Sequence, residues 1–179
     1  MLLVVDNGSV YTPSLLECLQ DLNLDFESHV FSNIPSLENY SSIILSGRRK
    51  NNPEMNIINS KLVNHSLEED KPLLGICYGA EILALTLGGT IKKMTLPRHG
   101  LYEINITKNN LLCSGKIKGF ESHSYMVSKL DSSFTQIATS DDCKFEIFQY
   151  DNKNIFGTQF HPEMSTDGKD LLKKFSLII

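Results

Sequence analysis

Short apolar runs alternate with longer amphipathic stretches in the first half of the chain. Leu2–Val5 and Ile43–Leu45 are continuous apolar runs of the kind that form buried strands, and Phe26–Phe31 has the composition of a further strand. Leucines recur on one helical face from Leu15 to Leu22, and apolar residues repeat that spacing over 57–65. Alternating strands and helices predict an α/β fold, with a mostly parallel central sheet covered by helices on both faces.

The second half of the chain has a different pattern, in which apolar and polar residues alternate one by one. The clearest case is Tyr102–Thr107, which is typical of a half-exposed strand. Similar runs occur at 135–139, 145–150 and 155–160. These runs predict a strand-rich, partly antiparallel segment that folds back onto the parallel sheet. The apolar positions of 170–179 predict a closing helix.

The chain has the length of one domain and the composition of a globular protein. It contains 179 residues, of which 41% are hydrophobic and 21% charged, so 1–179 is expected to form a single domain. The formal net charge of −4 gives no electrostatic reason to expect binding to nucleic acid or to an acidic membrane surface. No apolar window is long enough to cross a membrane, and Met1–Val5 lacks the basic flank of a signal peptide.

The four cysteines are spaced neither as metal ligands nor as a dense disulfide framework. A reduced, cytoplasmic setting is the simplest account of them, and no metal or cofactor is expected. Cys18, Cys113 and Cys143 are interpreted as buried packing residues. Cys77 stands in a more distinctive stretch of sequence.

Cys77 lies between a strand pattern and a helix pattern. Leu73–Ile76 is a short apolar run, and good helix formers follow from Tyr78 onward. Gly75 and Gly79 flank the cysteine symmetrically, as a nucleophile elbow requires, because the chain reverses so sharply there that neighbouring side chains would clash. The stretch therefore predicts a cysteine nucleophile. The alternative is a structural cysteine where a helix packs closely on a strand.

A second candidate element stands near the end of the chain, where a strand-like run is followed by His161, Pro162 and Glu163. A cysteine nucleophile needs an imidazole to accept its proton, and the imidazole needs an acceptor that fixes its tautomer. Glu163 is close enough in sequence to reach the far ring nitrogen of His161. Such a pair is weak evidence alone and strong evidence together with Cys77.

These two stretches carry a family resemblance. Gly75-Ile76-Cys77-Tyr78-Gly79-Ala80-Glu81 and Gln159-Phe160-His161-Pro162-Glu163 resemble the G-x-C-x-G-x-Q elbow and the Q-F-H-P-E strand end of class I glutamine amidotransferases. The resemblance extends over essentially the whole chain and implies a flavodoxin-like fold. It also implies hydrolysis of L-glutamine to glutamate and ammonia through a thioester on Cys77, with His161 carrying the proton and Glu163 orienting the imidazole.

The oxyanion of such a reaction needs backbone N–H donors, and here the sequence departs from the family. Tyr78 is expected to supply one donor, and the loop after Leu45 the other. The family has a second glycine after Ser46-Gly47, whereas this chain has Arg48, for which a positive φ would be strained. Either the loop takes another path, or a ligand or partner orders the hole. A third reading treats Arg48 to Asn52 as an exposed basic loop.

Glu81 is a second departure, because the family usually has glutamine at this position. Three roles stay open: pairing with the substrate α-ammonium group, raising the pKa of Cys77, or pairing with Arg48 or Arg49. The segment Ser122-His123-Ser124 is similar to a family segment that holds the two ends of glutamine. The resemblance therefore assigns Ser124 and Tyr125 to substrate binding, while His123 is either partner-facing or a hydrogen-bonded structural residue.

Within the family, Val5-Asp6-Asn7-Gly8-Ser9 with Tyr11-Thr12 is similar to the start of GMP synthase glutaminase subunits. The chain has no phosphate loop that would bind ATP, so the ammonia is expected to pass to a separate ATP-dependent synthetase of the ATP-pyrophosphatase type. Two alternatives remain. One is the amidotransferase subunit of another synthase, such as anthranilate synthase. The other is a non-catalytic binding or regulatory protein that has kept the fold.

Overall fold

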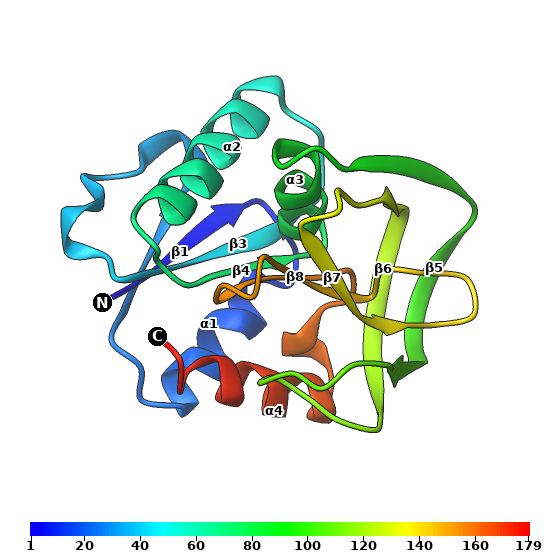
Figure 1. Cartoon of the computed structure of the whole chain (residues 1–179). Helices are drawn as coiled ribbons and strands as arrows, with labels where there is room; N and C mark the ends of the chain where they lie inside the picture. The colour runs from blue at the N-terminus through cyan, green and yellow to red at the C-terminus, as the bar shows by residue number, and fades with distance from the viewer.

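The computed structural model describes all 179 residues and is built on one nine-stranded sheet (Figure 1). The strand order is β2-β1-β3-β4-β9-β8-β7-β5-β6. The strands are β1 (Leu2–Asn7), β2 (Phe26–Val30), β3 (Ser42–Arg48), β4 (Leu73–Ile76), β5 (Thr90–Ile106), β6 (Lys116–Lys129), β7 (Phe134–Thr139), β8 (Ile147–Tyr150) and β9 (Ile155–Thr158). The helices are α1 (Thr12–Asp21), α2 (Pro53–Glu68), α3 (Tyr78–Thr86) and α4 (Thr166–Phe175), with 3-10 turns η1 (Phe31–Asn33), η2 (Leu37–Asn39) and η3 (Pro162–Met164).

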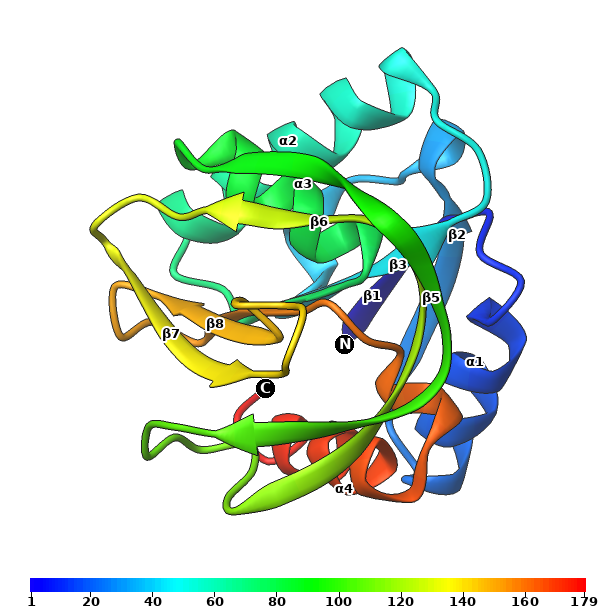
Figure 2. The ribbon, with the colours of Figure 1, turned by 90° about the vertical axis from the view of Figure 1, so that its right-hand side faces the viewer.

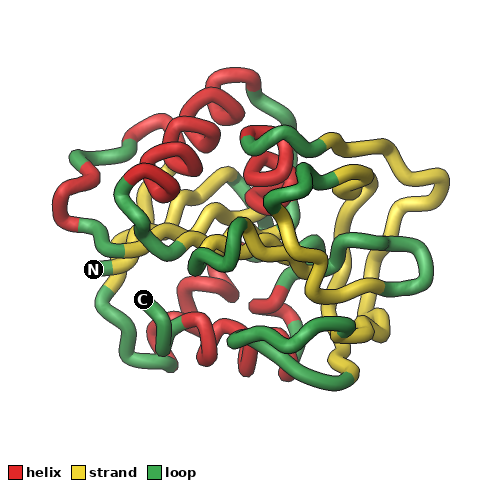
Figure 3. The backbone as a smooth tube through the Cα atoms, viewed as in Figure 1, coloured by secondary structure: helices red, strands yellow, loops and turns green.

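The first half of the sheet is parallel. Strands β2, β1, β3, β4 and β9 are joined by parallel pairs. Helices α2 and α3 lie on one face and α1 and α4 on the other, so strands form the middle layer (Figure 3). This arrangement confirms the predicted α/β fold with helices on both faces, and none of its helices has the length and hydropathy to cross a membrane.

The second half of the sheet is antiparallel, as predicted. Strands β8, β7, β5 and β6 follow β9 through antiparallel pairs. The two longest strands, β5 and β6, pair along most of their length and curve around one end of the molecule (Figure 2). This arm brings residues 122–125 to the end of the sheet where the parallel strands β3, β4 and β9 finish. The antiparallel segment therefore forms one wall of the candidate site.

The core consists of two apolar layers, one on each face of the sheet. Alternate residues of a strand point to opposite faces. Leu2 and Val4 of β1 therefore join the layer under α1 and α4, whereas Leu3 and Val5 join the layer under α2 and α3. All four side chains are almost completely buried. Packing on both faces holds the central strands, and with them the loops that leave their carboxyl ends.

Several predicted boundaries are wrong by a few residues. Helix α4 begins at Thr166 rather than at 170, because the Ser165 hydroxyl caps it by accepting a hydrogen bond from the backbone N–H of Gly168 at 3.1 Å. Strand β3 continues to Arg48, beyond the apolar run Ile43–Leu45. The run at 145–150 forms a strand only from Ile147, and that at 155–160 only as far as Thr158.

Candidate active site

Cys77 occupies a strained turn between β4 and α3. Its backbone has φ 52° and ψ −104°, a conformation that costs energy for a residue with a side chain. A Cβ added to Gly75 would lie 2.4 Å from the carbonyl oxygen of Gly79, and one added to Gly79 would lie 2.2 Å from that of Leu45. Neither flanking position therefore accepts a side chain without a shift of the backbone. The turn has the geometry expected of a nucleophile elbow.

His161 and Glu163 form a buried pair at the end of the run that follows β9. The Nδ1 atom of His161 lies 2.8 Å from Oε1 of Glu163, and both side chains are almost completely buried. The backbone N–H of His161 donates to the carbonyl of Phe120 on β6 at 2.7 Å. Gly47 also approaches the imidazole, because a Cβ there would lie 2.8 Å from Cε1. The ring is thus held on several sides.

The electrostatics of His161 depend on Cys77. Burial alone would lower the pKa of the His161 imidazole. Cys77 and, after it, Glu163 outweigh burial and raise this pKa to about 10. Since Nδ1 faces Glu163, Nε2 is the ring atom left for the thiol. The arrangement favours proton transfer from cysteine to imidazole.

Tyr11, at the start of α1, is a site residue that chemical reasoning from the sequence missed. Its ring centroid lies 4.6 Å from that of His161, with the planes tilted by 59°. Its hydroxyl donates to Oγ of Ser122 on β6 at 3.1 Å. Tyr11 therefore packs on the imidazole and links it to strand β6 through the hydrogen bond to Ser122. A lone tyrosine in a turn gives no chemical signal of such a role; the only sign was its place in the stretch that resembles GMP synthases.

A cavity of about 290 Å³, called the site cavity here, opens beside Cys77. Three segments line it: Arg48, Arg49 and Asn51 after β3, then Cys77, Tyr78 and Glu81 at the elbow, and residues 122–125 of β6. The structure therefore brings the predicted nucleophile together with every predicted substrate-binding residue. His161 and Glu163 do not line the cavity and are almost completely buried. The volume suits a small molecule.

Arg48 corrects the prediction for the loop after Leu45. It is the last residue of β3 and does not have a positive φ, so the backbone strain that a positive φ would cause does not arise. Its side chain is only 18% exposed, because the guanidinium group lies 4.2 Å from the centre of the Tyr78 ring and donates to Oδ1 of Asn51 at 2.7 Å. Arg48 is thus a fixed part of the cavity wall, whereas Arg49 and Lys50 are exposed as predicted.

Glu81 lies one helical turn beyond Cys77 and is also buried. Its carboxylate is 3.7 Å from the guanidinium of Arg48, which is the third of the roles left open by the sequence. Burial raises the pKa of Glu81, and the positive charge of Arg48 opposes that rise. Arg48 and Glu81, the two departures from the family pattern, therefore contact each other in the wall of the cavity.

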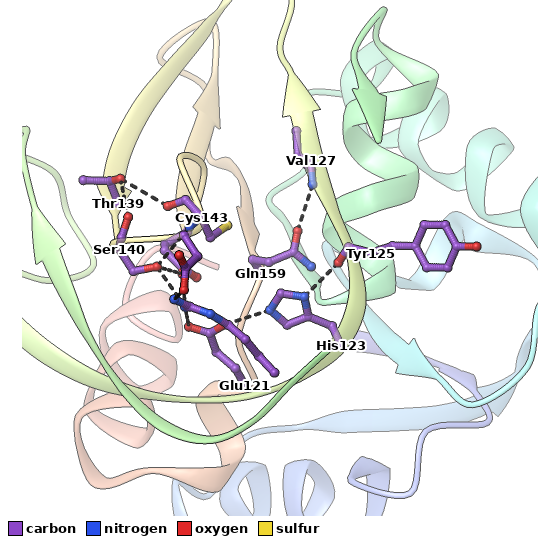
Figure 4. Close-up of polar contacts among 11 residues, drawn as sticks. Glu121, His123, Tyr125, Val127, Thr139, Ser140, Cys143 and Gln159 are labelled. Carbon is purple, nitrogen blue, oxygen red and sulfur yellow. Dashed lines mark hydrogen bonds and ion pairs between the residues drawn. The ribbon is translucent and has the colours of Figure 1, made fainter. Parts of the chain in front are cut away.

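His123 is hydrogen-bonded on both ring nitrogens. Nδ1 lies 2.8 Å from the carbonyl oxygen of Tyr125, and Nε2 lies 2.8 Å from a carboxylate oxygen of Glu121 (Figure 4). Of the two predicted alternatives, the structure therefore favours the hydrogen-bonded structural histidine. These bonds fix the part of β6 that lines the cavity.

The other carboxylate oxygen of Glu121 continues a buried network. It accepts from Arg98 at 2.6 Å, and Arg98 also donates to Asp142 at 2.8 Å. Glu146 lies 3.5 Å from the same guanidinium. Burial and the nearby charge of Glu121 raise the pKa of Glu146 to about 8. The network gives the arm a polar interior directly behind the cavity wall.

The described residues include no cluster of three or more histidine, cysteine, aspartate or glutamate side chains arranged to hold a metal ion. The four cysteines are buried and unpaired, so Cys18, Cys113 and Cys143 occupy the packing positions predicted for them. Cys77 is the one cysteine that lines the site cavity.

The fold and the site agree with one family of proteins. The family described as glutamine amidotransferase class-I matches residues 3–179, and the chain belongs to this family. Among its relatives is a GMP synthase subunit of Pyrococcus furiosus, named as glutamine-hydrolyzing. It is 31% identical over 188 residues that cover 99% of this chain and 98% of the relative.

Two further relatives carry similar names. The glutamine-hydrolyzing GMP synthase of Petrotoga mobilis is 34% identical over 181 residues, which are 97% of this chain but only 35% of that longer protein. The crystal structure of a protein described as a putative GMP synthase subunit from Thermoplasma acidophilum superposes with a TM-score of 0.86. It is 27% identical, and the match covers 99% of this chain and 92% of that one. The chain thus matches a whole subunit in one case and about a third of a larger enzyme in the other.

Proposed function

We propose that this chain is the glutaminase subunit of a GMP synthase. It hydrolyses L-glutamine to glutamate and ammonia as a single amidotransferase domain, and a separate ATP-dependent synthetase uses the ammonia. The observation that carries this proposal is the strained Cys77 turn beside the buried His161–Glu163 pair. The full-length match to the Pyrococcus furiosus subunit supports the choice of GMP synthesis among amidotransferase reactions.

The chemistry starts from Cys77 and His161. The imidazole takes the thiol proton, and the thiolate sulfur forms a bond to the side-chain amide carbon of glutamine. When the tetrahedral intermediate collapses, the C–N bond breaks and the imidazolium gives its proton to the leaving ammonia. Water, deprotonated by the same imidazole, then cleaves the thioester and releases glutamate. Glu163 stabilises the imidazolium through the 2.8 Å contact with Nδ1.

The oxyanion of that intermediate needs donors close to the elbow. The backbone N–H of Tyr78 follows the nucleophile at the start of α3, and the second donor comes from Gly47 or Arg48 at the end of β3. One such donor contributes about 3 kcal/mol to transition-state stabilisation. The fixed position of Arg48 supports a hole that is already formed in the free protein.

The zwitterionic end of glutamine is held by the rest of the cavity. Glu81 pairs with the α-ammonium group, and Ser124 and Tyr125 bind the same end of the substrate from β6. The positions of these residues along the cavity wall, and the burial of Glu81, support these roles. A substrate cation adds a second partner to a carboxylate that has only a 3.7 Å contact with Arg48.

The protein acts in the cytoplasm, where a reduced Cys77 persists. The four unpaired cysteines support this setting. Because ammonia becomes ammonium in neutral water, the synthetase must receive it close to the site cavity. The partner is therefore expected to bind at the cavity and not at a distant face.

Labelling of one cysteine tests the proposal. A diazoketone analogue of glutamine should modify Cys77 and stop ammonia release, and Cys77→Ser should abolish both labelling and hydrolysis. Cys113→Ser, which changes a buried cysteine outside the cavity, should behave like the wild type. Modification of Cys18, Cys113 or Cys143 in place of Cys77, or hydrolysis by Cys77→Ser at the wild-type rate, would contradict the assignment.

A further inference from the structure

A second cavity adjoins the site cavity. It encloses about 300 Å³ between α2, α3 and the strands β5 and β6, and is called the α3 groove here. Its wall toward Cys77 is formed by Arg48, Tyr78 and Glu81, which also line the site cavity. Ile82, Leu85 and Ile91 line the α3 groove alone, and Tyr125 lines both cavities. The Arg48–Glu81 pair borders both cavities and is called the partition here.

The open side of the α3 groove is apolar. Leu85 in the last turn of α3 and Tyr125 on β6 are each 42% exposed, whereas Ile82, one turn before Leu85, is buried. The Tyr125 ring points away from the buried network toward the surface (Figure 4). Apolar side chains gathered in a hollow beside a reaction site mark a binding surface more often than isolated exposed residues do.

Exposed cations occur in two segments that contribute residues to the two cavities. Arg49 and Lys50 are exposed in the segment between β3 and α2, and Lys93 is exposed on β5, where it pairs across the strands with Tyr125. Glu54 is the exposed carboxylate nearest to Lys50 along the chain. The protein as a whole has a net charge of −4, so this positive charge is a local feature. An acidic segment with an apolar side chain would match it in both charge and polarity.

We propose that the α3 groove is the docking surface for the synthetase subunit, through a segment of the partner that carries carboxylates and one apolar anchor. The inference rests on the proposed function, because that function requires a partner at the site cavity. The anchor contacts Leu85, Ile91 and Tyr125, and the carboxylates face Lys93 and Arg49. A segment in this position covers the Arg48–Glu81 partition and shields the neighbouring cavity from water.

Charge-reversing variants test the inference. Leu85→Glu places a carboxylate in the apolar hollow, and Lys93→Glu reverses one cation beside it. Leu177→Glu and Lys108→Glu make the same chemical changes at exposed positions outside both cavities and serve as matched controls. Binding of the purified synthetase subunit from the same organism is measured by calorimetry, and ammonia release by each free variant is measured in parallel.

Leu85→Glu and Lys93→Glu should each weaken synthetase binding at least tenfold, with ammonia release by the free protein within twofold of the wild type. The two controls should bind like the wild type. Equal binding by all variants, or no binding by the wild-type chain, would overturn the docking surface, even if Cys77 labelling upholds the glutaminase. Light scattering that shows a dimer broken by Leu85→Glu would assign the groove to a second copy and also overturn it. Binding that depends on Leu85 in a protein without glutaminase activity would uphold the surface and refute the proposed function.

Discussion

The Nδ1 atom of His161 lies 2.8 Å from Oε1 of Glu163, and the second carboxylate oxygen of Glu163 has no hydrogen-bond partner although it is buried. A buried carboxylate with one free oxygen is costly, and one contact with an imidazolium offsets more of that cost than contact with a neutral ring. Glu163 is therefore expected to stabilise the protonated form of the His161 imidazole more than the neutral form.

Replacing Glu163 by glutamine should slow catalysis while the fold is kept. Glu163→Gln retains the shape of the side chain but loses the charge that stabilises the imidazolium, so kcat for ammonia release should fall by about 10²-fold or more. Steady-state glutaminase assays measure this change. Glu17→Gln, at an exposed position on α1, is the control. A Glu163→Gln enzyme with kcat within twofold of the wild type would exclude a role for the carboxylate.

The raised pKa of His161 predicts a specific dependence of stability on pH. The folded-state pKa of about 10 is above the usual value near 6.5, so the stabilisation is complete below about pH 6.5 and is lost as the pH rises toward 10. Cys77→Ala removes the contribution of Cys77 and leaves only Glu163 to oppose burial, so the pKa of His161 should fall. NMR titration of the imidazole Cε1 proton measures both values. Identical titrations in Cys77→Ala and wild type would show that the two groups are not coupled.

Glu81→Gln separates the three roles of this carboxylate. If Glu81 holds the α-ammonium group, KM for glutamine should rise about tenfold, as expected for losing a charged hydrogen bond of about 1.5 kcal/mol. Thermal melting reports the loss of the Arg48 pair, and the rate of Cys77 alkylation against pH reports any effect on the thiol. We expect the largest change in KM. A variant unchanged in all three measurements would remove Glu81 from the site.

The buried network of the arm should make the protein less stable in mild alkali. Glu146 has a folded-state pKa of about 8, above its ordinary value of 4.5, so the folded state holds a proton that the unfolded chain releases. Stability should therefore fall as the pH rises from about 4.5 to 8. Glu146→Gln should reduce this fall, and Glu103→Gln, at an exposed position, should not. Melting temperatures at pH 5.5 and 8.5 measure the difference, and equal slopes in wild type and Glu146→Gln would contradict the prediction.

Local sequence was enough to predict the elbow and the His161–Glu163 pair. The glycines around Cys77 serve a turn of a few residues, and Pro162 keeps His161 close to Glu163, so both features follow from neighbouring residues. Arg48 was harder to predict, because its position depends on Tyr78 from α3 and Asn51 from the following loop. A basic run in isolation predicts a solvated loop.

The buried network of charged residues next to the cavity wall was not predicted from the sequence. Arg98, Glu121 and Glu146 come from β5, β6 and the segment before β8, and charged residues in strands normally predict exposed positions. Their burial depends on partners that only the folded sheet brings together. The start of α4, however, could have been predicted from the sequence, because a serine before Thr166 is a known N-cap signal.

Strand β9 lies between β4 and β8 in the middle of the sheet, although it is the last strand in the chain. During synthesis the Cys77 turn leaves the ribosome long before His161 does, because domains are made from the N-terminal end. Until β9 arrives, β4 has one unpaired edge and the thiol has no base. On the proposed mechanism, the growing chain is therefore expected to hydrolyse glutamine only after the final strand has closed the sheet.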